Sequence, residues 1–131
     1  MTVLQALNAR VSRRAYTDKP IPPELILRLE KNIETVNRIA GLSIRFLPDG
    51  SGAFARLSKT YGLLTGVRSL FCMAGQAEDP FLREKIGYYG EFLVLSATQM
   101  GLGTCWIGGS FDKEYPFYEL APSEKLVCVV A

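Results

Sequence analysis

The sequence predicts a single α+β domain, because long helical patterns and short strand patterns both occur along its 131 residues. Apolar residues recur every three or four positions over 24–40 and 80–100, which predicts two long helices with a buried face. Alternation over 42–46 and continuous apolar runs at 67–74 and 126–131 predict strands. Hydrophobic residues make up 48% of the chain, which is enough for a core and excludes a disordered tail.

The N-terminal region is expected to form two helices separated by a proline-rich turn. The first helix should be short and end near Arg10, and its apolar positions at helical spacing are Leu4, Leu7 and Val11. The prolines within 17–23 prevent it from continuing, and Pro23 suits the first turn of the next helix. The second helix should end at Gly41, and its buried stripe should consist of Leu25, Leu29, Ile33, Val36 and Ala40.

The remaining chain combines turns, strands and one long helix. The segment 48–52 has turn composition, whereas 53–66 carries a weak helical pattern broken by glycines and stays ambiguous. The helix over 80–100 is apolar around most of its girth, which predicts a central position. Asp112 is expected to cap a brief helix through Tyr118, and the final apolar run is expected to be a central strand.

The composition excludes several classes of function. The chain has no histidine, which excludes Ser-His-Asp and Cys-His catalysis and histidine-ligated metals, and no metal site is predicted. The formal net charge of +2 argues against a protein that mainly coats nucleic acid. No stretch reaches the ~20 apolar residues of a membrane span, so no membrane partner is expected. Any chemistry must come from other side chains or from a cofactor.

The cysteines are interpreted as buried thiols. They lie far apart among apolar neighbours, with no Cys-x-x-Cys spacing, at Cys72, Cys105 and Cys128. Free buried thiols are typical of a reducing compartment, so we expect a cytoplasmic protein. Arginines without acidic residues over 1–14 also resemble an organelle transit peptide, although this segment is not rich in serine.

The segment Arg10-Val11-Ser12-Arg13-Arg14 is a candidate phosphate site. It offers two guanidinium groups and a hydroxyl at alternate positions, Arg10, Ser12 and Arg14, where a helix gives way to extended chain. Bidentate charged donors together with a neutral donor are what a phosphate monoester requires. A solvated basic edge of the molecule is the alternative interpretation.

The segment 101–109 contains four glycines and is a candidate contact for a flat ligand. It follows a predicted helix, whereas a dinucleotide fingerprint follows a strand, and it has no Gly-Lys-Ser/Thr of a Walker A loop. Glycine pairs after a strand let the backbone lie close against a ligand. A helix cap followed by a tight turn explains the pattern as well. Gly87 and Gly90 within the long helix indicate close approach by another helix or by a ligand.

Together these segments resemble the FMN-dependent nitroreductase family. The resemblance depends on 10–16, on Gly87-Tyr88-Tyr89-Gly90-Glu91-Phe92, and on the glycine-rich segment ending Trp106-Ile107-Gly108-Gly109. It implies a mixed, mainly antiparallel sheet flanked by helices, in an intertwined homodimer with flavins at the interface. It also implies that FMN is bound by Arg10, Val11, Ser12, Arg14, Trp106, Ile107, Gly108 and Gly109.

Within that set, the resemblance assigns the FMN phosphate and ribityl chain to Arg10, Ser12 and Arg14, and the flavin ring to the backbone of 107–109. No side chain is expected to be catalytic, because the chemistry takes place at the flavin N5. The implied activity is an oxidoreductase that passes electrons from NAD(P)H to a small-molecule acceptor by ping-pong exchange. Two alternatives remain: a non-catalytic flavin- or nucleotide-binding module, and a structural half of a larger assembly.

Two departures from the family pattern add expectations. The Pro-Ser-x-x-Asn-x-Gln-Pro-Trp stretch is missing, since 39–43 passes directly into a strand. The chain also stops at Ala131, where relatives continue. We therefore expect a C-terminally shortened nitroreductase-like domain over 1–131 that leaves apolar surface or a sheet edge uncovered. It should self-associate as at least a dimer and hold flavin weakly.

Overall fold

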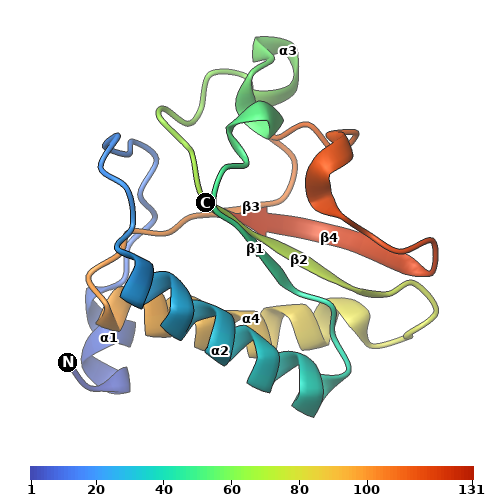
Figure 1. The fold of residues 1–131 in the computed structure, drawn as a ribbon, viewed down its shortest axis with the longest axis horizontal. Coiled ribbons are helices and arrows are strands. Elements are labelled where there is room, and N and C mark those ends of the chain that lie inside the picture. The colour runs from blue at the N-terminus through green and yellow to red at the C-terminus, as the bar shows by residue number, and fades with distance from the viewer.

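The computed structural model describes all residues from 1 to 131 and has both helices and strands (Figure 1). The α-helices are α1 (Val3–Ala9), α2 (Pro23–Ala40), α3 (Leu57–Thr60) and α4 (Leu82–Gln99). The strands are β1 (Arg45–Leu47), β2 (Leu70–Gln76), β3 (Trp106–Ile107) and β4 (Glu124–Val130). Two short 3₁₀ helices are η1 (Ser51–Phe54) and η2 (Pro116–Tyr118). The predicted α+β class is confirmed.

The four strands form one sheet in the order β1-β2-β4-β3. Each neighbouring pair is antiparallel, in agreement with the mainly antiparallel sheet that was predicted. Parallel pairing is limited to two isolated bridges, Ser12 with Thr104 and Ala15 with Thr65. The last strand is central, as predicted, because β2 and β3 pair with its two edges. The expected uncovered edge therefore does not lie on β4.

Helices cover the two faces of the sheet unequally. Figure 1 shows α2 and α4 side by side on one face, where α2 buries Leu29, Ile33, Val36 and Ala40, the predicted stripe except for half-buried Leu25. On the opposite face, the short elements η1 and η2 cover a smaller core built around Phe111 and Tyr118. Each face thus has its own hydrophobic cluster, and the sheet lies between them.

Local signals fix most element boundaries. Thr2 forms a capping box with Gln5 at the start of α1, and Pro23 is the first residue of α2. Gly41 ends α2 in the left-handed region with φ 65°, as predicted. The ambiguous segment 53–66 contains the end of η1 and the single turn α3, followed by left-handed residues at 61, 62 and 66.

Two boundaries differ from the prediction. The strand expected over 67–74 is β2, which begins at Leu70. Val67 is buried, but it lies outside the hydrogen-bonded ladder of the sheet. Asp112 does not cap a helix through Tyr118: its carboxylate accepts from the Glu114 N–H at 3.0 Å and forms a turn. Pro116 forces the preceding residue into extended geometry (φ −55°, ψ 123°), so only η2 can follow.

The thiols lie mainly in the interior. Cys72 and Cys105 are buried, Cys128 is half-buried, and all three are free. Burial raises the pKa of Cys72 to about 12 and that of Cys128 to about 11, so both stay protonated and unreactive near neutral pH. No helix has the length and apolar character needed to cross a membrane.

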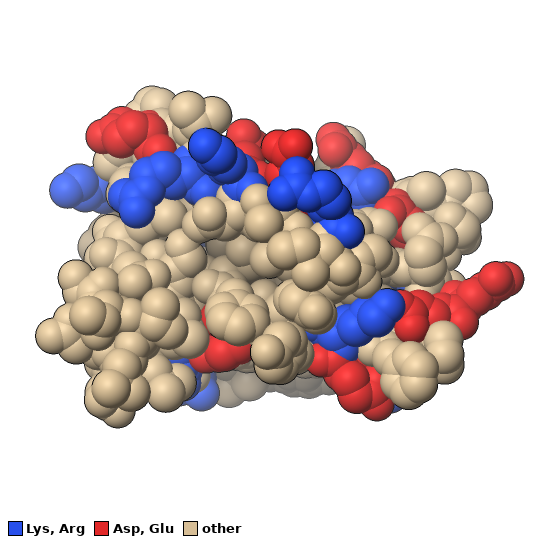
Figure 2. Space-filling model, turned by 90° about the horizontal axis from the view of Figure 1, so that it is seen from below, with Lys and Arg blue, Asp and Glu red and all other residues tan.

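The apolar face predicted for α1 is exposed. Only Ala6 of this helix is buried, while Leu4 is 66% and Leu7 54% exposed. On neighbouring α4, Tyr88 and Phe92 are also exposed and stack edge to face. Figure 2 shows charged side chains along one border of the helical side and a broad uncharged area toward the end where α1 lies. The uncovered apolar surface expected from the sequence therefore lies on α1 and α4.

Candidate functional site

The segment 10–16 joins the two predicted halves of the site. It leaves α1 at Arg10 in extended geometry, and the Arg13 N–H donates to the Thr104 carbonyl at 2.9 Å. On its other side, the Thr65 N–H donates to the Arg14 carbonyl at 2.8 Å. Ser12 and Thr104 form an isolated parallel β-bridge between the two backbones. The basic segment is therefore held beside the glycine-rich segment that precedes β3, although the two are about ninety positions apart in the sequence.

Glu91 of α4 contacts both halves of the site through one carboxylate. Its Oε1 lies 3.7 Å from Nε of Arg10, and its Oε2 accepts from the Trp106 indole N–H at 2.9 Å. The ion pair is partly exposed, so it adds little to stability, but it orients both partners. The sequence analysis named Glu91 only as part of the segment 87–92 and did not predict this role. The sequence did offer one signal for this role: Glu91 is a carboxylate on a mostly apolar helix, and a carboxylate in such surroundings needs a partner.

Arg10 keeps an unsatisfied donor. Its Nη1 is buried and has no hydrogen-bond partner, although Nε faces Glu91. Buried polar groups normally find a partner, so this nitrogen fits an oxyanion ligand better than a purely structural arginine. The residues of this segment therefore fit a phosphate group. The neighbouring candidates Val11, Ser12 and Arg14 are exposed, and Arg14 makes no ion pair within the chain.

The four candidates of the glycine-rich segment form β3 and the turn after it. Ile107 is buried, and Trp106 is half-buried with its indole against Gly90. Gly108 and Gly109 are exposed, and a Cβ at either position would meet no atom within 4 Å. The backbone at this turn is open to a flat ligand. Gly90 has the close approach that its sequence position predicted, whereas Gly87 faces open space.

Tyr16 closes the far end of the basic segment. Its hydroxyl donates to the Arg13 carbonyl, and its N–H donates to the Thr65 carbonyl at 2.9 Å. Burial raises the pKa of Tyr16 to about 12, so this phenol remains protonated at neutral pH. Tyr16 therefore acts as a fixed donor that stabilises the extended backbone, and not as an acid or base.

Comparisons with known proteins agree with this architecture. A family model described as "Putative TM nitroreductase" matches residues 2–131. An FMN-dependent nitroreductase from Clostridium difficile is similar with a TM-score of 0.73 and 18% identity, over 98% of this chain and 84% of that one. A nitroreductase with bound FMN from Bacteroides fragilis has a TM-score of 0.65 and 18% identity, over 98% and 86% of the two chains. No curated protein sequence matches.

The two kinds of comparison carry different weight. At 18% identity, the solved structures are evidence for the fold, namely an antiparallel sheet with α2 and α4 on one face. The family model is evidence for descent, since it accounts for the whole chain apart from the first residue. It includes the basic segment after α1 and the glycine-rich segment 101–109, which the structure joins at Thr104. This chain therefore belongs to the nitroreductase family of oxidoreductases.

Proposed function

We propose that the chain binds FMN and passes electrons from NAD(P)H to a small-molecule acceptor. The observation that carries this proposal is the buried, unpartnered Nη1 of Arg10. Glu91 links this arginine to Trp106, and the open glycine turn begins two residues after Trp106. An oxyanion would satisfy that nitrogen, and a flat ring would fit against backbone that lacks side chains. Solved relatives described as FMN-dependent or as containing bound FMN support the choice of cofactor.

In this proposal Arg10 and Arg14 bind the phosphate, and the Ser12 hydroxyl binds the phosphate or the ribityl chain. The backbone of 107–109 faces the ring, while Trp106 is held by Glu91 at 2.9 Å. When bound, FMN supplies the hydride chemistry, which fits a chain without histidine. The protein contributes charge and orientation, and no side chain is assigned an acid or base role.

We also propose a homodimer in the cytoplasm. The exposed apolar residues of α1 and α4, including Leu4, Leu7 and Phe92, form a surface of the kind that proteins cover by association. The three free thiols suit a reducing compartment. Light scattering at micromolar concentration is expected to give a mass of at least twice 14.5 kDa.

A flavin-binding module without turnover is the second candidate. It is favoured by the region between α2 and β1, where the family asparagine is missing and the nearby Asn37 has a structural task. The Asn37 amide donates to the Ile44 carbonyl and accepts from the Ile44 N–H, both at 2.9 Å. Asn37 therefore holds the start of β1 and is not free to contact a ring.

A visible spectrum separates these functions. Purified protein mixed with FMN and freed of excess flavin is expected to stay yellow and to bleach when NADPH or NADH is added without oxygen. Retained flavin that neither nucleotide reduces would assign the chain to the non-catalytic module. Protein that stays colourless after mixing with FMN would contradict both proposals.

Replacing Arg10 with alanine is expected to weaken FMN binding by about 1–3 kcal/mol, the cost of losing a charge-assisted hydrogen bond. The unfolding temperature without flavin should hardly change, because the ion pair with Glu91 is partly exposed. Flavin titration followed by fluorescence measures the affinity. Arg28→Ala, on the exposed face of α2, is the control and should bind normally. An Arg10→Ala protein that unfolds without flavin would make the arginine structural.

A further inference from the structure

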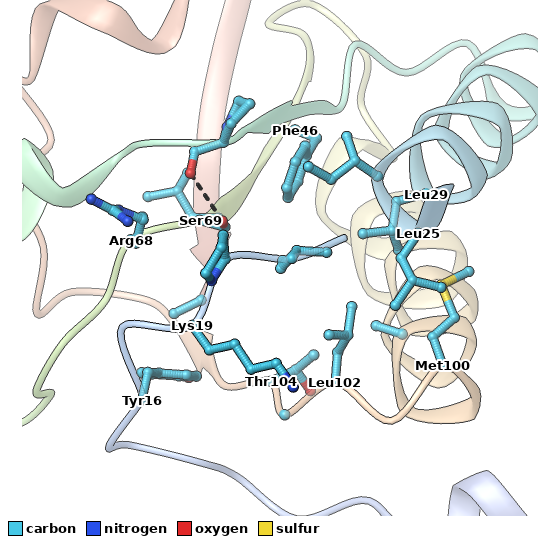
Figure 3. Close-up of a pocket in the computed structure, with 18 of the residues that line it drawn as sticks. Tyr16, Lys19, Leu25, Leu29, Phe46, Arg68, Ser69, Met100, Leu102 and Thr104 are labelled. Carbon is cyan, nitrogen blue, oxygen red and sulfur yellow. Dashed lines mark hydrogen bonds between the residues drawn. The ribbon is translucent and has the colours of Figure 1, made fainter. Parts of the chain in front are cut away.

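A second ligand-sized space lies behind the basic segment. An open cavity of about 790 Å³ is lined by the segment 13–22, by α2, by the end of α4 with the segment 100–104, by the end of β1, the start of β2 and the end of β4 (Figure 3). None of the eight residues predicted to bind FMN lines it. Successive side chains of an extended segment point to opposite sides. Arg13 and Ala15 accordingly line the cavity, whereas Ser12 and Arg14 do not. The cavity and the candidate flavin surface are therefore separate sites.

One side of the cavity is apolar. Figure 3 shows Leu25 and Leu29 from α2, Phe46 from β1 and Met100 after α4 gathered on that side. Of the 27 residues that line the cavity, 14 are hydrophobic. Pockets that bind organic molecules have this character, with a few polar groups that fix orientation. The walls therefore suit a hydrocarbon or aromatic body.

The opposite side is basic. Arg13, Lys19 and Arg68 line the cavity together with a single acidic side chain, Asp49, and the last residue, Ala131, also lines it. The Asp49 carboxylate is already engaged, since its Oδ1 accepts from the Ser51 N–H at 3.1 Å and from the Ser51 hydroxyl at 2.6 Å. The cations are exposed at the rim and make no ion pair within the chain. An anionic head group would meet a net positive rim.

A buried hydroxyl marks where the head group binds. Thr104 lines the cavity, is only 4% exposed, and its Oγ1 has no hydrogen-bond partner. A buried hydroxyl without a partner costs free energy, so a ligand that accepts its hydrogen bond gains what the free protein lacks. Figure 3 shows the Lys19 side chain extending toward Thr104, so a cation and a neutral donor converge there.

We propose that this cavity binds a small amphipathic carboxylic acid. The carboxylate binds at Lys19 and the Thr104 hydroxyl, and the apolar body packs against Leu25, Leu29 and Phe46. The site goes beyond the proposed flavin function and does not depend on it, because no candidate flavin residue takes part. It gives this nitroreductase a second ligand, bound on the other side of the segment that carries Arg10.

Calorimetric titration of the full chain with decanoate, below its micelle concentration, tests the site. Decanoate is expected to bind, decanol to bind at least tenfold more weakly, and acetate to show no binding, because both head and body are needed. Decanoate should leave the FMN affinity unchanged, so a failure of flavin binding and a failure of this site are distinguishable. Folded protein that does not bind decanoate, or that binds decanol equally well, would overturn the proposal.

Two variants locate the bound carboxylate. Lys19→Gln is expected to weaken decanoate about tenfold, and Thr104→Val about fivefold, the range for lost charged and neutral hydrogen bonds. Thr104→Val should not lower the unfolding temperature, since it removes a buried hydroxyl that has no partner. Lys31→Gln, on the exposed face of α2 and outside the cavity, removes the same charge and is the matched control. This variant should bind decanoate normally. Equal affinity in all three variants would mean adsorption to an exposed apolar face such as α1, and would overturn the assignment.

Discussion

Gly108→Val is expected to abolish measurable FMN binding while the flavin-free protein keeps its unfolding temperature. A Cβ at Gly108 meets no atom of the chain within 4 Å, and the residue is not in the left-handed region. Valine can therefore adopt the native backbone without a clash. Its two methyl groups would instead project from the turn after β3 into the surface proposed for the flavin ring. Overpacking of this kind costs about 1–3 kcal/mol, enough to remove a weakly held cofactor.

The measurement is a flavin titration paired with a thermal melt of the same flavin-free sample. The pairing matters because Ile107, one residue earlier, is buried in β3, and damage to the strand would lower the melting temperature. A loss of flavin binding at unchanged melting temperature supports the proposed contact. A Gly108→Val protein that binds FMN as well as the parent would remove the glycine turn from the site and leave only the basic segment.

Much of the fold could be predicted from the sequence because its signals are local. The stripe that ends at Ala40 and the stop at Gly41 depend on helical periodicity and on backbone sterics. The central position of 126–131 followed from its continuous apolar run, and β4 does lie between β2 and β3. Periodicity shows which face is apolar but not what covers it. The apolar face of α1 was therefore recognised, while its exposure was not.

The site could be predicted only in part, because its contacts join distant segments. The basic segment and the glycine-rich segment 101–109 each have a local pattern, and the fold brings them together through the pairing of Ser12 with Thr104. The link through Glu91 joins positions 10, 91 and 106, and no spacing rule covers such a set. The cavity behind Arg13 is harder still to foresee, since residues from α2, β1, β2 and the end of α4 line it together.

At Gly90, the packing of α4 and the placement of Trp106 in the candidate site both depend on the absence of a Cβ atom. A Cβ there would lie 2.7 Å from Cη2 of Trp106, closer than packed atoms approach, and 3.3 Å from Cε of Met73, which is tighter than most contacts. The methionine is flexible and can move, but the indole is held by its hydrogen bond to Glu91. Any side chain at Gly90 therefore has to push Trp106 away from α4.

Gly90→Val is accordingly expected to lower the free energy of unfolding by about 2–3 kcal/mol, at the upper end for overpacking. Trp106 is the only tryptophan, so its fluorescence reports directly on the lost Glu91 contact. Gly87→Val is the matched control, because it lies one turn earlier on the same helix and a Cβ there meets nothing within 4 Å. Its unfolding free energy should change by less than about 0.5 kcal/mol, since valine is a slightly better helix former than glycine. Equal losses in both variants, with unchanged fluorescence, would mean that the α4 backbone resists valine anywhere and that Gly90 has no special contact with Trp106.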